Sequence, residues 1–276
     1  MSNYKITKTN DGYVVEIFAK TKKEIGKEIL DTAEGVSILD IDKNKTEEEQ
    51  YLIYKDIAEK MEYSPVVIRI CEREKDVTNL KTQLRATLRA ATSGDISIVF
   101  SMIPSVNELK EYKQILEECK TELKIANEPY KNHIKIGVMI EIPSAALMSY
   151  ELARECDFLF IETNNLFNFT FGKKINSSQT TEEQRKALPA IKKLIQQAVE
   201  GAHDSGIYCG ICGDIVENEL YIPLLIGLGI DEFSVETKNI IKIRERINQL
   251  DKYDCRELIE EVIILRNGEE IEKKLK

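Results

Sequence analysis

The sequence predicts a single (β/α)8 barrel. Apolar runs typical of buried strands alternate with helical segments along the whole chain, and we count eight such pairs. With 276 residues, 42% of them hydrophobic, the chain can bury one large core, and a barrel of typical size would use nearly all of it. We therefore expect one domain over residues 1–276, with the barrel at about 12–250 and a helical tail at 251–276.

The expected strands are short runs that are apolar on both faces, which is typical of a parallel sheet covered by helices or closed into a barrel. The central run ends in a carboxylate, Glu141, and is followed by Pro143, which can open a helix. In chain order the expected strands are 12–19, 35–40, 65–71, 96–103, 136–142, 157–162, 207–212 and 232–235.

The expected helices begin at residues that can cap a helix. Thr21 and Ser105 each have a glutamate three residues further on, and Thr46 is followed by three glutamates in the first turn. The charged run NGEEIEKKLK at 267–276 is expected to be a frayed, solvated end. The expected helices cover 21–33, 46–61, 76–91, 105–123, 144–154, 181–203, 217–227 and 237–250.

Composition excludes several classes of partner. The net charge of -9 argues against a general nucleic-acid surface, and no stretch approaches the roughly 20 apolar residues of a membrane span. The N-terminus lacks the apolar core of a signal peptide, so we expect a cytoplasmic protein without nucleic-acid or membrane partners. The six cysteines are dispersed, which favours free thiols over a disulfide framework.

Polar residues gather where the expected strands end. A barrel brings these ends to one mouth, where the loops that follow the strands are free to vary and to hold ligands. The set offers a carboxylate for a metal, a cation for an anionic ligand, amide groups and a thiol. Its members are Asp40, Arg69, Glu141, Thr163, Asn164, Asn165, Cys212, Asp214 and Ser234.

Four segments carry a family resemblance. GVMIEIPSAALMSYELARECDFLFIETNNL at 137–166 and GICGD at 210–214, with TQLRATLRAA at 82–91 and GIDEFSV at 229–235, resemble the barrel that binds phosphoenolpyruvate (PEP) in PEP-utilising enzymes. The likeness is strongest to enzyme I of the bacterial sugar phosphotransferase system, the PEP-protein phosphotransferase. It extends over nearly the whole chain, and several motifs in the same order make it more specific than any one motif.

The resemblance implies a chemistry for the mouth. In that family a glutamate and an aspartate hold Mg²⁺, arginines hold the phosphate, and a cysteine protonates the enolate carbon while the phosphoryl group passes to a histidine. By position, Glu141 matches the metal-binding glutamate and Asn165 the second metal ligand. Arg69 matches a phosphate-binding arginine, Asn164 the asparagine of the T-N-D motif, and Cys212 the proton donor.

The chain departs from the family at several of these positions. It has TNNL in place of T-N-D-L, so that Asn165 offers a neutral oxygen, and Asp40 stands where a phosphate-binding arginine is expected. The passage at 70–80 is too short for the family's glycine-rich loop and its arginine, and Ile175 stands at the position of another arginine. The sequence therefore predicts a weakened Mg²⁺ site and impaired or altered PEP phosphotransfer.

Two function classes stay open. In the first, the barrel still binds a small anionic keto or enol acid, such as PEP, pyruvate or an analogue, with a divalent metal. In the second, it is a non-catalytic scaffold or a metabolite-sensing pseudoenzyme, in which an ion pair between Glu141 and Arg69 serves only as a polar plug. We expect no phosphohistidine domain in these 276 residues, and His133 and His203 are poorly placed, so phosphotransfer is expected to need a separate phosphohistidine-carrier protein. The resemblance also implies a homodimer.

Other motifs have simpler interpretations. Cys212 could be a small buried hydrophobe, and the CxxC that it forms with Cys209 lies inside an expected strand without a second cysteine pair, which disfavours zinc or redox use. The alternating phenylalanines at 167, 169 and 171 are expected to pack over the mouth. Arg85 and Arg89 lie four residues apart on a helix and are interpreted as surface or dimer contacts.

Overall fold

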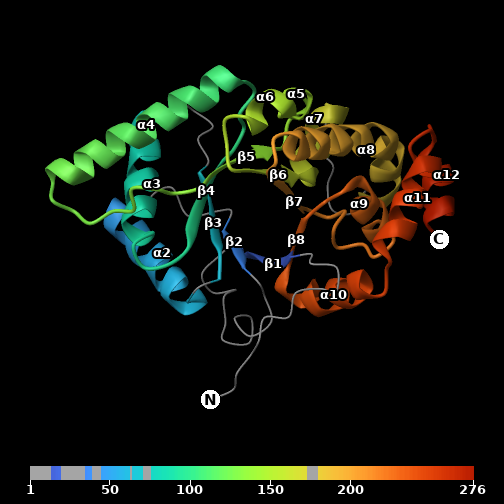
Figure 1. Cartoon of the computed structure of the whole chain (residues 1–276), viewed down its shortest axis with the longest axis horizontal. Helices are drawn as coiled ribbons and strands as arrows, with labels where there is room; N and C mark the ends of the chain where they lie inside the picture. The colour runs from blue at the N-terminus through green and yellow to red at the C-terminus, as the bar shows by residue number, and fades with distance from the viewer. Residues whose placement is uncertain (1–13, 20–34, 39–44, 63, 71–75, 173–179) are drawn as a thin grey trace, which may run out of the picture.

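Eight parallel strands close into a barrel in sequential order, which confirms the predicted fold (Figure 1). The computed structural model describes residues 14–19, 35–38, 45–62, 64–70, 76–172 and 180–276. The strands are short, between three and six residues long. Helices cover the barrel on the outside and side chains fill it on the inside. They are β1 Val14–Ala19, β2 Val36–Ile38, β3 Val66–Ile70, β4 Ile96–Phe100, β5 Ile136–Ile140, β6 Phe158–Glu162, β7 Tyr208–Cys212 and β8 Glu232–Val235.

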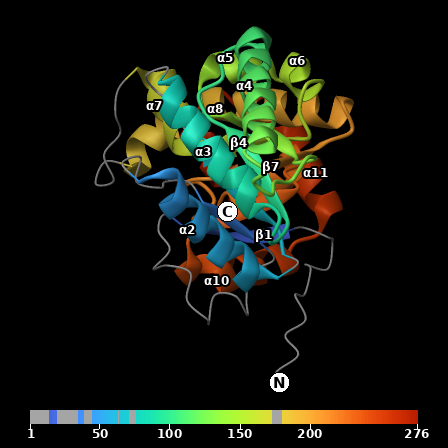
Figure 2. The ribbon, with the colours of Figure 1, turned by 90° about the vertical axis from the view of Figure 1, so that its left-hand side faces the viewer.

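Helices surround this barrel, and Figure 2 shows α3 and α4 running side by side on one face. Thr46 opens α2 as predicted and forms a capping box with Glu49, while Ser105 caps α4 by accepting from the amide of Glu108. The expected helix at 21–33 lies outside the described residues. The helices are α2 Glu47–Met61, α3 Val77–Ala90, α4 Val106–Ile125, α5 Pro143–Leu147, α6 Ser149–Ala153, α7 Thr163–Phe171, α8 Thr180–Asp204, α9 Ile222–Leu228, η2 Thr237–Asn239, α10 Ile240–Asn248, α11 Lys252–Val262 and α12 Gly268–Leu275.

Some helices differ from the prediction. The expected helix at 144–154 is broken into α5 and α6 at Met148, where α8 packs closely: a Cβ on Gly201 would lie 2.7 Å from the Ser149 hydroxyl. The segment that contains the alternating phenylalanines is helix α7, so these side chains do not share one face. Phe167 is buried, whereas Phe169 is half exposed, and the prediction that all three pack over the mouth is wrong.

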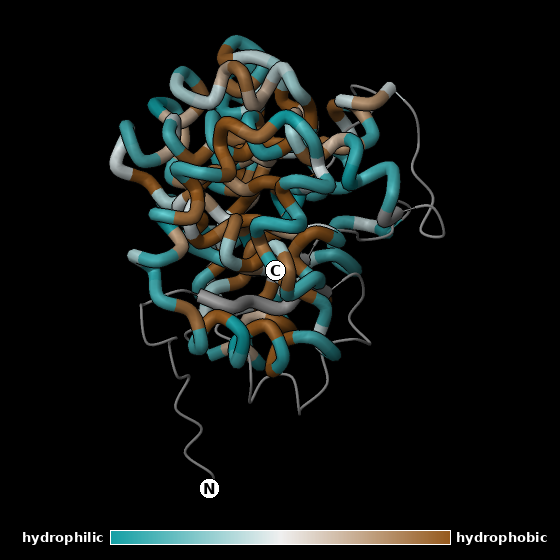
Figure 3. The backbone as a smooth tube through the Cα atoms, turned by 90° about the vertical axis from the view of Figure 1, so that its right-hand side faces the viewer, coloured by the Kyte–Doolittle hydropathy of each residue, from teal (hydrophilic) through white to brown (hydrophobic). Residues whose placement is uncertain are grey.

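Two aromatic rings fill the middle of the barrel interior. Phe158 and Phe160 point inward and pack with other inward side chains, and glycines on neighbouring strands make room for their rings. A Cβ on Gly137 would lie 2.3 Å from the Phe158 ring, and one on Gly210 would lie 2.7 Å from the Phe160 ring. A second, larger core lies between the strands and the helices, and Figure 3 shows the apolar segments, in brown, running through the middle of the molecule. Two buried polar residues, Ser97 of β4 and Glu232 of β8, also lie on the interior side near the amino ends of their strands. A larger polar cluster lies at the carboxyl ends of the strands.

The C-terminal tail packs on the barrel instead of fraying, so the prediction for 267–276 is wrong. Helix α12 begins at its cap Asn267 and buries Ile271 and Leu275, which lie four residues apart on one face. At its first residue, Gly268, a Cβ would lie 1.9 Å from the carbonyl oxygen of Arg185 in α8. Most charged residues of the run are exposed, as on the polar face of an amphipathic helix, but Glu272 accepts hydrogen bonds from Arg185 and Tyr221.

A fully buried lysine joins this tail to the barrel. The ammonium group of Lys192 in α8 donates to the carbonyl oxygens of Val262, Ile263 and Leu265, at the C-terminal end of α11. Val262 ends α11, and Ile263 and Leu265 follow it, where the negative end of the helix dipole favours a cation. Lys192 therefore acts as a charged cap between two helices.

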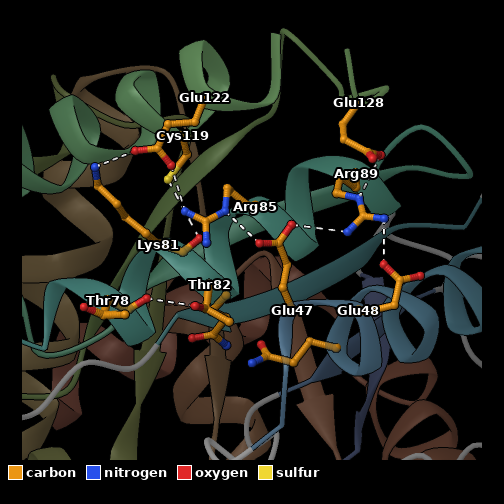
Figure 4. A network of polar contacts seen from close by, with 12 residues as sticks. Glu47, Glu48, Thr78, Lys81, Thr82, Arg85, Arg89, Cys119, Glu122 and Glu128 are labelled. Atoms are coloured by element: carbon orange, nitrogen blue, oxygen red, sulfur yellow. Dashed lines mark hydrogen bonds and ion pairs between the residues drawn. The ribbon is translucent and has the colours of Figure 1, made fainter. Parts of the chain in front are cut away.

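Arg85 and Arg89 form ion pairs within the chain. Arg85 contacts Glu47 and Glu122, both at 2.7 Å, and Arg89 contacts Glu47 at 3.2 Å and Glu48 at 2.8 Å (Figure 4). The two arginines thus link α3 to the N-terminal turn of α2 and to α4. Both arginines are half-buried, and their charges are matched by carboxylates of the same chain. Their interpretation as dimer contacts stays a prediction.

Candidate functional site

Glu141 is the centre of the polar cluster at the mouth. It follows β5 directly and is fully buried. Oε2 accepts from Arg69 Nη2 and from Asn165 Nδ2, each at 2.7 Å, and Oε1 accepts from the hydroxyl of Ser101 and from the backbone N–H of Met102 at 2.7 Å. Each carboxylate oxygen therefore has two protein donors, which offsets the unfavourable burial of its charge.

Arg69 supplies the positive charge of this cluster from the end of β3. It is 7% exposed, and its Nε and Nη2 also donate to the Ser101 hydroxyl at 3.0 and 2.8 Å. Ser101 thus accepts from Arg69 while it donates to Glu141. Met102 has a φ of 59°, a left-handed conformation that is unfavourable for a residue with a side chain, and in it the N–H of Met102 reaches Glu141.

The two asparagines of TNNL have different partners. Because a carboxylate only accepts, Asn165 presents its amide nitrogen, not its oxygen, to Glu141. Asn164 instead donates to Asp214 Oδ1 at 3.1 Å and accepts from the amide of Asp214 at 2.9 Å, which ties the end of β6 to the end of β7. The mouth therefore brings Arg69, Glu141 and Asn165 together and directs Asn164 elsewhere.

Glu162 is a residue of the mouth that sequence reasoning missed. It ends β6, and its carboxylate accepts from the amides of Asn164 at 3.0 Å and Asn165 at 2.8 Å, the first N–H groups of α7. Burial raises the pKa of Glu162, and the two amides oppose that shift. The signal was present, because a carboxylate that ends a buried strand is the same feature that selected Glu141.

Cys212 faces the barrel interior and is fully buried. The strand register places it between Glu162 on β6 and Ser234 on β8. Burial raises the pKa of the Cys212 thiol well above its usual range, and the carboxylates of Glu162 and Glu141 add to that shift. Cys209 belongs to the outer core, on the other face of β7, so the two cysteines of the CxxC do not converge on one ligand.

The raised pKa predicts that Cys212 does not react with thiol reagents in the folded protein. The thiolate is the reactive form, and a pKa above the ordinary value means that it forms only at correspondingly higher pH. In an Ellman titration at pH 8, native wild-type protein and the Cys212→Ser variant should release the same amount of chromophore. After denaturation the variant should show one thiol fewer. A smaller native signal from Cys212→Ser would contradict this prediction.

Neither histidine of the sequence lies at the mouth. His133 is exposed and precedes β5, at the opposite end of the barrel. His203 lies in α8, and its Nε2 is 2.9 Å from Asp231 Oδ2, just before β8 begins. Asp40, the passage 71–75 and Ile175 lie outside the described residues, so those expected departures stay predictions.

Sequence comparison decides the family. The model of the PEP-binding domain of PEP-utilising enzymes matches residues 68–252, which is more than half of the chain. The chain belongs to the PEP-utilising enzyme family. The PEP-protein phosphotransferase of Bacillus subtilis is 33% identical over 96% of this chain, and that of Staphylococcus aureus is 32% identical over the same share.

The PEP-utilising barrel is only part of those relatives, since the chain spans about half the length of the curated proteins that it matches, 53% for the Bacillus subtilis protein. The match extends over 303 residues, more than the 276 of this chain, so the relative carries residues that this chain lacks.

Solved structures support the barrel fold. A citrate lyase from Burkholderia xenovorans has a TM-score of 0.65 at 14% identity, and covers 95% of this chain and 88% of its own. A malate synthase from Haloferax volcanii has a TM-score of 0.60 at 10% identity, over 86% of this chain and 74% of its own. At these identities the likeness shows the fold alone. Within the described residues, no helix is long and apolar enough to cross a membrane.

The family's metal ion does not fit the donors described at the mouth. Mg²⁺ prefers oxygen ligands in octahedral geometry and usually takes one or two carboxylates. Here both oxygens of Glu141 already accept from protein donors, one of them a guanidinium, and Asn165 turns a nitrogen toward the site. Among the residues described, no three His, Cys, Asp or Glu side chains form a group that could hold a metal. The donors described at the mouth therefore do not form the family's Mg²⁺ site.

Proposed function

We propose that this chain is a non-catalytic member of the PEP-utilising family, a barrel that has lost PEP phosphotransfer and acts as a scaffold or a sensor of a small metabolite. The observation that carries the proposal is that both carboxylate oxygens of Glu141 accept hydrogen bonds from the protein. All four of its hydrogen-bond donors come from the chain itself, and Arg69, the cation expected to hold a phosphate, is engaged with Glu141 at 2.7 Å.

Electrostatics favours this arrangement over the family's chemistry. A metal approaching Glu141 would have to displace the Arg69 guanidinium from a buried charge pair, which would leave two charges to be satisfied elsewhere. Asn165 provides no second negative charge to compensate. A phosphate on the ligand would meet one described cation, Arg69, with the buried carboxylates of Glu141 and Glu162 beside it.

The positions of the other groups agree with the proposal. Cys212 is a buried thiol whose pKa is raised, and neither histidine lies at the mouth, so phosphotransfer would need a histidine outside these 276 residues. The competing function is metal-assisted binding of a small keto or enol acid. It is favoured by the presence of Glu141, Arg69 and Cys212 in one mouth. The homodimer and the cytoplasmic location implied by the family stay predictions.

Restoring the missing carboxylate should restore metal binding. We expect Asn165→Asp to be less stable than wild type without metal, because the new carboxylate lies beside Glu141 and replaces a donor by a like charge. Mg²⁺ or Mn²⁺ should then raise its thermal unfolding midpoint saturably, by about 2–4 °C or more at high occupancy. The wild-type midpoint should not respond to either ion.

Asn132→Asp is the matched control for Asn165→Asp. It makes the same chemical change at an exposed residue near the opposite end of the barrel, and it should not respond to metal. A saturable response of the wild-type protein equal to that of Asn165→Asp would contradict the proposal. So would a folded Asn165→Asp variant that shows no metal response.

A further inference from the structure

The N-terminus of α7 opens into the mouth, and a carboxylate of the chain covers it. The first N–H groups of a helix form a natural site for an anion, because they are unpaired within the helix and lie at the positive end of its dipole. Glu162 contacts two of these groups, one with each oxygen, at 3.0 and 2.8 Å. Its side chain is 6% exposed, so this carboxylate is held inside the mouth and not in solvent.

Glu162 is joined to the rest of the mouth through the strand register. It pairs with Cys212 on β7, and Cys212 pairs with Ser234 on β8, so that the three inward side chains form one row across the barrel wall. The Ser234 hydroxyl is 1% exposed and has no hydrogen-bond partner among the described residues. A buried hydroxyl with unused capacity is a group that a ligand could satisfy.

We infer that Glu162 is a specificity-determining residue that occupies the anion position of the mouth, so that a free carboxylate or phosphate is excluded from the α7 amides unless Glu162 is removed. The carboxylate of Glu162 presents the same two oxygens to the amides that a ligand carboxylate would present. Its negative charge also lies close to Glu141, which disfavours a second anion nearby. A small carboxylate in the vacated position would lie in the same row as Cys212 and Ser234.

Removal of the Glu162 side chain tests this inference by chemical rescue. The variants are Glu162→Ala, which vacates the position, Glu162→Ser, which keeps a short capping hydroxyl so that α7 still starts normally, and Glu162→Gln, which fills the position with a neutral amide. Thermal unfolding of each is followed with sodium formate, acetate, oxalate or inorganic phosphate, against sodium chloride at equal ionic strength and without metal.

Glu162→Ala and Glu162→Ser should have lower midpoints than wild type, and small carboxylates should raise those midpoints saturably, by about 2–4 °C beyond chloride. Wild type and Glu162→Gln should show no such anion-specific rise. Glu151→Ala, which removes an exposed glutamate from α6, controls for the loss of one surface charge. If neither Glu162→Ala nor Glu162→Ser distinguishes carboxylates or phosphate from chloride, or if wild type responds equally, the inference is overturned.

The inference rests on the proposed function in one respect, that an anion would reach the mouth without a metal. The two can fail separately. Metal-dependent PEP binding by the wild-type protein would overturn the proposed function and leave the comparison of the Glu162 variants unaffected. If small anions do not stabilise those variants, the role of Glu162 is overturned. The proposal that rests on the protein donors around Glu141 is then unaffected.

Discussion

Arg69→Met should destabilise the folded protein by about 3–5 kcal/mol, the range expected when one partner of a buried ion pair is removed. Glu141 is fully buried, and without the guanidinium its charge would keep only the donors from Ser101, Met102 and Asn165. Methionine preserves most of the volume of the arginine stem, so the loss reflects the charge more than packing. Equilibrium unfolding in urea measures the change.

A double-mutant cycle separates the ion pair from other effects of Arg69→Met. Glu141→Gln removes the stranded charge, so the double variant should be clearly more stable than the sum of the two single changes predicts. Arg85→Met is the matched control, because that arginine forms partly exposed pairs with Glu47 and Glu122 and should lose only about 1 kcal/mol. If Arg69→Met and Arg85→Met lower the free energy of unfolding equally, the Arg69–Glu141 pair does not behave as a buried ion pair.

Lys192→Met should lower the free energy of unfolding by about 3 kcal/mol or more. Its ammonium group donates to three carbonyls at the end of α11, and charged hydrogen bonds contribute roughly 1.5–3 kcal/mol each, although not additively. In the variant these three carbonyls would either stay buried without the lysine donor or become exposed to water as the end of α11 opens. We therefore also expect α11 and α12 to be cleaved more readily by proteases under native conditions.

Lys193→Met is the control for Lys192→Met, since the neighbouring lysine lies on the same helix but is exposed. Its effect should stay within about 0.5 kcal/mol of zero. If both variants unfold at the same urea concentration and their C-terminal helices resist protease equally, Lys192 does not hold the tail to the barrel as we describe.

The barrel could be predicted from the sequence because its strands are apolar on both faces and its helices have readable caps. Every residue of Val66–Ile70 and of Phe158–Glu162 is buried, and Thr46 caps α2 as expected. The same strand-end rule placed Arg69 and Glu141 at one mouth, and their ion pair was one of the interpretations that the sequence left open. These features depend on local pattern and on the general geometry of parallel strands.

The partners of each group could not be predicted in the same way. The position of a strand end predicts which residue reaches the mouth. The conformation of the turn that follows decides which atoms of that residue form hydrogen bonds, and with which partners. Helix α7 starts immediately after β6, and this turns Asn165 toward Glu141 and Asn164 toward Asp214. Ser101 was expected inside a strand that in fact ends at Phe100, so its role as a bridge to Arg69 was not visible.

The tail was wrongly predicted for a different reason. Its charged residues outnumber its apolar ones, and this suggested a solvated end, yet Ile271 and Leu275 at a spacing of four form one buried face. The surface that they cover, including α8 next to Gly268, exists only in the folded barrel. Tertiary contacts therefore decided the structure of a segment whose composition pointed the other way.

The most direct test of the central claim is a calorimetric titration of the wild-type protein with PEP, with and without Mg²⁺ or Mn²⁺. If Glu141 is held by its own chain and Asn165 provides no metal ligand, adding the metal should produce no metal-dependent heat of PEP binding. Metal-dependent binding that disappears in Glu141→Ala would contradict the account, because it would show that Glu141 still coordinates a metal for a PEP ligand.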